Sequence, residues 1–171
     1  MTRNTLASVG LLVCSVFAPS FLSAQEAVYV VRHAEQANEA EDPALTSAGQ
    51  QRADMLAEFL RDARITGIFT SEAQRTRQTA RPLAEALSLT AVEIPRDEVD
   101  HLISAVRQQQ PEGRVLIVGH SQTIPLILRA LGFEDYVEIQ QSEYDNVFQV
   151  LPRSEGTPLV FRYHLTLPPE I

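Results

Sequence analysis

The 171-residue chain contains one cysteine and no tryptophan, and aromatic residues make up only 6% of it. The single cysteine, Cys14, lies in an apolar N-terminal stretch, so the rest of the chain has no disulfide and no thiol chemistry. So few aromatic side chains provide no obvious platform on which bases or sugars could stack. Acidic residues outnumber basic ones by 22 to 14, and the formal net charge of -8 argues against nucleic acid or an anionic membrane surface as a partner.

The N-terminal segment has the pattern of a secretory signal peptide. Arg3 is followed by an uncharged, apolar stretch over 5–22, and small residues precede Gln25. We expect cleavage after Ala24, so that residues 1–24 are the signal peptide and 25–171 form one domain that is periplasmic or secreted and not inserted in a membrane. The alternative is an uncleaved anchor, because the stretch is close to the minimum of about 17 residues that spans a bilayer.

Strand and helix patterns alternate along the rest of the chain. Strands are predicted at 27–31, 67–70, 91–94, 114–118, 146–151 and 159–165, and helices at 46–63, 73–87, 97–110 and 122–131. This order predicts an α/β domain whose mainly parallel sheet carries helices on both faces. Because ligands in such sheets bind outside the carboxyl ends of the strands, residues at strand ends are the first candidates for a site.

Arg32 and His33 follow directly after the first predicted strand. An imidazole can act as a covalent nucleophile, and a neighbouring guanidinium offers a planar set of donors for phosphate. Two further predicted strands are followed by an arginine and a histidine, Arg75 and His120. The sequence therefore predicts a cluster of these side chains at one edge of the sheet, with the chemistry that phosphoryl transfer needs.

Four motifs stand in order along this part of the chain. Arg32-His33-Ala34-Glu35 is the first, and the others lie at 45–53, 71–80 and 118–121. Together they resemble the motifs of the histidine phosphatase superfamily, which has the phosphoglycerate-mutase-like fold, and in particular its short, SixA-type members of branch 1. The resemblance runs from about Val28 to about Val150, with Ala34 in place of the glycine of the family's R-H-G motif.

The resemblance implies a role for each matching residue. His33 would be the nucleophile that takes up the phosphoryl group, and Arg32, Arg75 and His120 would surround that group without a metal or another cofactor. His33 must be neutral to attack, and we expect a hydrogen bond to a backbone carbonyl to fix its tautomer. At Ser121, backbone amides could hold phosphate oxygens, while ordinary capping of the next helix would also explain this serine.

In the family, a general acid commonly lies between the motifs that match 71–80 and 118–121. Glu98 is our candidate, with Asp97 and Asp100 as alternatives, and His120 could also serve. An acidic first turn of a helix would explain the same cluster without catalysis. Residues 143–146 are interpreted as a turn, although short family members carry a similar segment near the pocket.

Arg75 and Arg77 are predicted on one helix, where residues two apart do not share a face. The motif assigns Arg75 to the pocket, so we expect Arg77 to face solvent or to form an ion pair.

Three functions are compatible with these observations: a metal-independent phosphatase acting through His33, a phosphomutase of the same fold, and a catalytically silent phosphate-binding module. The short connections between motifs favour hydrolysis, because a mutase needs loops that exclude water. The complete set of four site residues weighs against a silent module. The expected substrate is a phosphorylated small molecule or a phosphoprotein; the sequence identifies neither it nor the oligomeric state.

Overall fold

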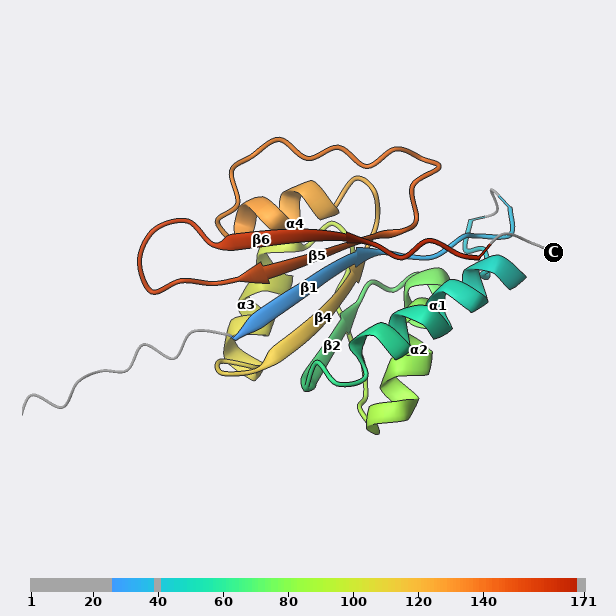
Figure 1. Ribbon diagram of the computed structural model, residues 1–171, viewed down its shortest axis with the longest axis horizontal. Helices are drawn as coiled ribbons and strands as arrows, with labels where there is room; N and C mark the ends of the chain where they lie inside the picture. The colour runs from blue at the N-terminus through green and yellow to red at the C-terminus, as the bar shows by residue number, and fades with distance from the viewer. Residues whose placement is uncertain (1–25, 39–40, 169–171) are drawn as a thin grey trace, which may run out of the picture.

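A computed structural model describes residues 26–38 and 41–168 of the chain, and the predicted signal peptide lies outside these residues. Strands and helices alternate as predicted (Figure 1). The strands are β1 (Ala27–Arg32), β2 (Ile65–Thr70), β3 (Val92–Glu93), β4 (Arg114–Gly119), β5 (Asn146–Leu151) and β6 (Leu159–His164), and the helices are α1 (Ser47–Leu60), α2 (Gln74–Leu87), α3 (Val99–Gln109) and α4 (Ile124–Ala130).

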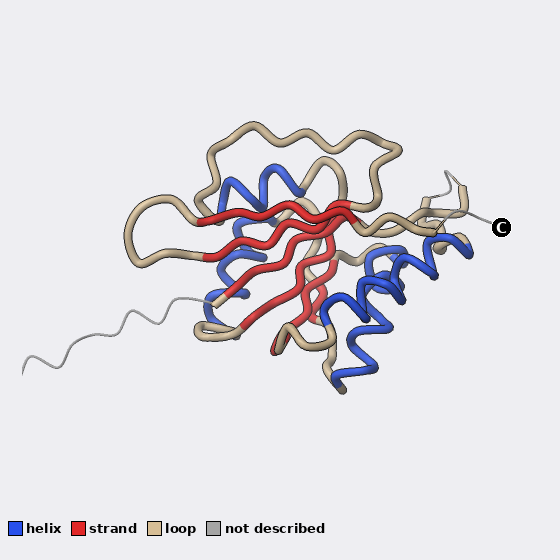
Figure 2. The backbone as a smooth tube through the Cα atoms, viewed as in Figure 1, coloured by secondary structure: helices blue, strands red, loops and turns tan. Residues whose placement is uncertain are grey.

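The strands form one sheet in the order β3-β2-β4-β1-β5-β6. The neighbours from β3 to β1 are parallel, whereas β5 and β6 are added as antiparallel strands at one side. Helices cover both faces of the sheet (Figure 2). The prediction of a single α/β domain with a mainly parallel sheet is therefore confirmed.

Two apolar cores separate the sheet from its helices. Because successive residues of a strand point to opposite faces, Val28 and Val30 of β1 pack with α3 and α4, whereas Tyr29 and Val31 pack with α1 and α2. All six residues of β1 are buried. Burial on both faces explains why this strand is a continuous apolar run with no alternation.

The first residues of α1 and α4 show where local sequence pattern was sufficient to place the start of a helix and where it was not. Thr46 is the N-cap of α1, and its hydroxyl accepts the Gly49 N–H at 3.0 Å. In contrast, α4 begins at Ile124, and the residue at its cap position is Thr123. Ser121 therefore does not cap this helix. The Thr123 hydroxyl accepts the backbone N–H of His120 at 2.9 Å, which fixes the turn after β4.

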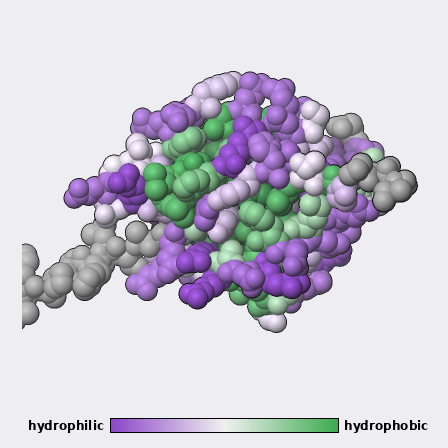
Figure 3. All heavy atoms as spheres, viewed as in Figure 1, coloured by the Kyte–Doolittle hydropathy of each residue, from purple (hydrophilic) through white to green (hydrophobic). Residues whose placement is uncertain are grey.

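Side chains on one face of β6 are only partly covered by the helices. Leu159, Phe161 and Tyr163 share the α1 and α2 face and are between 37% and 49% exposed. Apolar side chains gather on this face over β5 and β6 (Figure 3). Among residues 26–38 and 41–168, no helix combines the length and the apolar character needed to cross a membrane.

Candidate active site

Five side chains predicted from the sequence lie together at the carboxyl ends of the strands. Arg32 ends β1 and His33 follows it, while His120 and Ser121 follow β4. Arg75 joins them from the first turn of α2. All five line one open cavity of about 710 Å³. The topology brings them together because β1, β2 and β4 are adjacent parallel strands whose ends meet at one edge.

His33 is held as a neutral imidazole. Its ring is buried, and its Nδ1 lies 2.8 Å from the carbonyl oxygen of Ala34. Burial lowers the pKa of His33 to about 3; the Ala34 carbonyl opposes this shift, and the charge of Arg32 adds to it. A carbonyl can only accept, so Nδ1 carries the proton and Nε2 keeps its lone pair. This is the backbone partner that sequence analysis expected.

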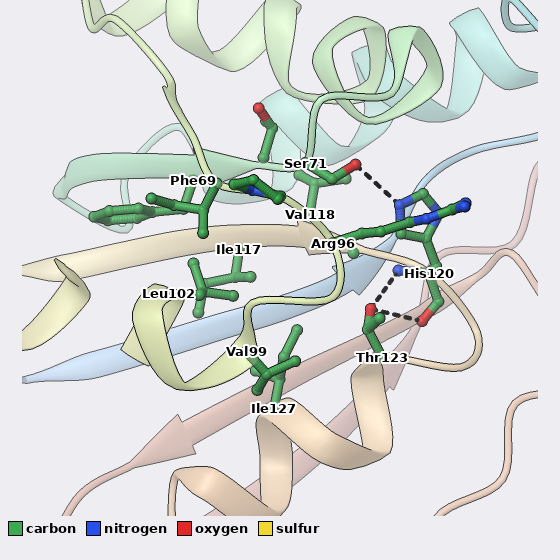
Figure 4. A pocket seen from close by; sticks show the side chains of 14 residues that line it. Phe69, Ser71, Arg96, Val99, Leu102, Ile117, Val118, His120, Thr123 and Ile127 are labelled. Atoms are coloured by element: carbon green, nitrogen blue, oxygen red, sulfur yellow. Dashed lines mark hydrogen bonds between the residues drawn. The ribbon is translucent and has the colours of Figure 1, made fainter. Parts of the chain in front are cut away.

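His120 takes the opposite tautomer. Its Nδ1 lies 3.3 Å from a guanidinium nitrogen of Arg75, which can only donate, so the ring proton is on Nε2. Nε2 then donates to the hydroxyl of Ser71 at 2.9 Å (Figure 4). Burial, together with the charges of Arg75 and Arg96, lowers the pKa of His120 to about 4. The rings of His33 and His120 are 5.3 Å apart, edge to face.

Arg32 is fixed by a segment that lies 108 to 111 residues later in the chain. One of its terminal nitrogens donates to the carbonyls of Gln140, Gln141 and Glu143 at 3.1, 2.8 and 3.0 Å. The ring of Tyr144 lies 4.0 Å from the guanidinium carbon, within the range of a cation–π contact. Sequence analysis interpreted residues 143–146 as a turn and missed this contact.

Arg75 and Arg77 diverge on α2 as expected. The side chain of Arg75 is 11% exposed and lines the cavity. Arg77 is 42% exposed; it donates to the carbonyl of Glu72 at 2.7 Å and pairs with Glu93 at 3.3 Å. Of these two arginines, Arg75 is therefore the one that is available to a ligand of the cavity.

Glu98 is not brought together with the other predicted residues. Its carboxylate lies 2.8 Å from the ring of His101 and is half exposed. It lines a neighbouring hollow with Asp100, whereas Asp97 and Val99 line both this hollow and the cavity. Helix α3 begins at Val99, two residues later than predicted, so Glu98 precedes the helix.

Ala34, which stands where the family's R-H-G motif has glycine, is buried. Its N–H donates to the Thr79 hydroxyl at 2.9 Å, which ties the loop after β1 to α2. Asn38 does not line the cavity; Gln36 does. Gln36 also donates to the carbonyl of Asn38 at 3.0 Å.

The donor set of the site suits an oxyanion. Arg32 and Arg75 each have a buried Nε atom with no hydrogen-bond partner within the described part of the chain. Guanidinium donors bind phosphate oxygens in a fixed planar geometry. In the same residues, no group of three or more His, Cys, Asp and Glu side chains is placed to hold a metal ion.

The family model of the histidine phosphatase superfamily (branch 1) matches residues 28–98. This stretch is 71 of the 171 residues, and over it the chain is similar to the histidine phosphatase superfamily. The matched stretch contains Arg32, His33 and Arg75, and His120 lies beyond it.

A curated relative, Probable phosphoglycerate mutase GpmB of Enterobacter sp. (strain 638), is 36% identical over 107 residues, which is 54% of this chain and 50% of the relative. The corresponding protein of Yersinia enterocolitica is matched over 35% of its length. The chain thus spans half or less of the curated relatives cited here.

Solved structures share the fold over most of their length. The structure described as phosphohistidine phosphatase SixA from Agrobacterium tumefaciens is 25% identical, with a TM-score of 0.59, and the match covers 75% of this chain and 93% of that one. The protein histidine phosphatase SixA in complex with tungstate is 17% identical, with a TM-score of 0.67, and the match covers 81% of this chain and 96% of that one.

Proposed function

We propose that this chain is a phosphatase that hydrolyses a phosphomonoester or a phosphoprotein through a covalent phosphohistidine on His33. The observation that carries the proposal is the buried, neutral imidazole whose Nδ1 is tied to the Ala34 carbonyl. This hydrogen bond leaves Nε2 as the nucleophilic atom. Arg32, Arg75 and His120 line the same cavity and supply the positive charge and donors that a transferring phosphoryl group requires.

The reaction has two steps. In the first, Nε2 of His33 forms a bond to phosphorus while the bond from phosphorus to the leaving group breaks. In the second, water attacks the phosphohistidine and returns a proton to the group that protonated the leaving oxygen, the P–N bond breaks with its electron pair on Nε2, and inorganic phosphate is released. The leaving oxygen needs a proton in the first step. We assign this proton to Asp97, because its side chain lines the cavity and that of Glu98 does not.

Hydrolysis is favoured over transfer to a second substrate. A mutase must keep water away from its phosphohistidine, whereas the cavity of about 710 Å³ is open to solvent. The relatives named as mutases are matched over half or less of their length. SixA proteins, named as phosphohistidine phosphatases, are matched over more than nine-tenths of theirs, which supports a phosphoprotein as one substrate class.

Export is part of the proposal. It depends on Arg3 and the uncharged stretch over 5–22, which precede the described residues. N-terminal sequencing of the protein recovered from a bacterial periplasm or culture medium tests it. A first residue at Gln25 would support export, and an intact Met1 in the membrane fraction would contradict cleavage.

The first experiment measures hydrolysis of p-nitrophenyl phosphate and of a phosphohistidine peptide in the presence of EDTA. We expect EDTA-resistant turnover that is lost in His33→Ala and retained in the control His101→Ala, since His101 is exposed and bonds only Glu98. A denatured-protein assay should recover an acid-labile, base-stable phosphoryl group on the wild type. Turnover that survives in His33→Ala would refute the proposed nucleophile.

A further inference from the structure

Arg96 is a third arginine of the cavity, and neither the motifs nor the proposed chemistry assigns it a role. It lies in the loop between β3 and α3 and lines the cavity together with Arg75 and His120. Its side chain extends alongside the His120 ring (Figure 4). The charge of Arg96 contributes to the lowered pKa of His120, which agrees with this proximity.

Protein contacts fix the backbone of Arg96 and leave its guanidinium available. The Arg96 N–H donates to a carboxylate oxygen of Glu72 at 2.9 Å. The side-chain contact with Glu72 is loose, at 3.9 Å from Nε, and the side chain is 60% exposed. Within residues 26–38 and 41–168, the two terminal nitrogens of Arg96 have no hydrogen-bond partner. Arg32 differs, since one of its terminal nitrogens already serves three carbonyls.

The cavity therefore has an inner and an outer cationic zone. The inner zone is formed by Arg32, Arg75 and His120 around His33, and one phosphoryl group occupies it in the proposed reaction. Arg96 forms the outer zone on the α3 side, in a cavity much larger than a phosphate. Asp97 and Glu41 also line the cavity and disfavour an anion beside them, so the position next to His120 is the one that attracts a second anion.

We propose that Arg96 is a second anion subsite, and that the substrates of this site carry a carboxylate or a second phosphate close to the transferred phosphoryl group. The inference rests on the proposed function for the identity of the transferred group. A guanidinium binds either anion through paired hydrogen bonds, which a neutral neighbour of the phosphoryl group would not provide.

Calorimetric titration of the purified protein with three stable probes tests the subsite without turnover. Methylphosphonate carries one anionic centre, methylenediphosphonate adds a second phosphonate, and phosphonoacetate adds a carboxylate. We expect the two larger probes to bind about tenfold more tightly than methylphosphonate, the effect of roughly one charge-assisted contact. In Arg96→Gln this advantage should fall below about threefold, while methylphosphonate binds as before. Arg77→Gln is the matched control, because Arg77 lies outside the cavity.

The outcomes separate the inference from the proposed function. Equal affinity of all three probes for the wild type would overturn the second subsite, and so would an advantage that persists in Arg96→Gln. A gain for only one of the larger probes that Arg96→Gln removes would support the subsite and identify its anion. If no probe binds, methylphosphonate included, the proposed phosphate site itself fails, and the inference fails with it.

Discussion

Binding of a doubly charged oxyanion should lead to protonation of His120. In the ligand-free structure burial and the charges of Arg75 and Arg96 hold the pKa of this ring at about 4, so it is neutral at pH 6.5. Its Nδ1 accepts from Arg75 at 3.3 Å. When an anion enters the inner zone, Arg75 gains a stronger acceptor, and Nδ1 can be protonated and donate to the anion.

The size of the shift follows from Coulomb's law. One negative charge at about 4 Å, with an effective dielectric constant of about 20, contributes about 4 kcal/mol. At about 1.4 kcal/mol per unit, this raises the pKa of His120 by about 3 units, to about 7 in the complex. Because the pKa of His120 is higher in the complex, binding takes up a proton between about pH 4 and about pH 7. As the pH rises through this window, the affinity falls by up to tenfold per pH unit.

Calorimetry with sulfate, a dianion throughout this window, measures the uptake. At pH 6.5 the binding enthalpy should differ between two buffers of different ionisation enthalpy by an amount that corresponds to most of a proton. His33, whose pKa starts lower at about 3, takes the smaller share. His120→Asn should therefore remove most of the buffer dependence, and the exposed control His101→Asn should retain it. Binding without buffer dependence, or with the same dependence in His120→Asn, would refute this reasoning.

Three further substitutions probe the supports of the site. Tyr144→Leu removes the ring over Arg32 and should lower kcat/KM by about 2- to 30-fold, from about 0.5 to 2 kcal/mol for a cation–π contact, whereas Tyr144→Phe should retain activity; equal losses in both would exclude that contact. Gly49→Ala places a methyl group against the carbonyl oxygen of Glu35 and should destabilise the fold by about 1–3 kcal/mol, seen as a lower melting temperature; an unchanged Tm would contradict the close packing. Thr76→Val removes a fully buried hydroxyl that bonds the Ala73 carbonyl at 2.8 Å and the Ser71 hydroxyl at 3.0 Å, so urea denaturation should show a loss of about 1–3 kcal/mol, and an unchanged free energy of unfolding would contradict a stabilising role for these bonds.

The fold could be predicted from local pattern because its central strands are short and fully buried. β1 and β4 are continuous apolar runs, and each is followed by polar residues that end the strand. Helix boundaries were less accurate. The turn after β4 is fixed by the Thr123 hydroxyl on the His120 N–H, a contact that delays α4 to Ile124 and that hydrophobic periodicity does not reveal.

The inner zone of the site could be predicted because strand ends and motifs coincide there. Arg32 ends β1 and His120 follows β4. Because these two strands are parallel neighbours, the proximity of the two residues follows from the sheet topology. The contacts that hold Arg32 could not be predicted, since Gln141 and Tyr144 come from a loop more than 100 residues away. Glu98 shows a different limit: α3 begins two residues later than predicted, so Asp97 and Glu98 lie before the helix, and helical periodicity could not indicate which of them lines the cavity.

The charge of the chain and the charge of the site act on different length scales. The chain has no lysine, and its 14 basic residues are all arginines. Three of them, Arg32, Arg75 and Arg96, line one cavity. At moderate ionic strength, screening limits the range of the field from the net negative surface charge to about 10 Å. Within that range the charge still opposes the approach of a long polyanion. The arginines act at contact distance on a partly buried anion, where screening is weak. This contrast agrees with the proposed function, in which the site takes a phosphoryl group on a small molecule or on an exposed protein side chain.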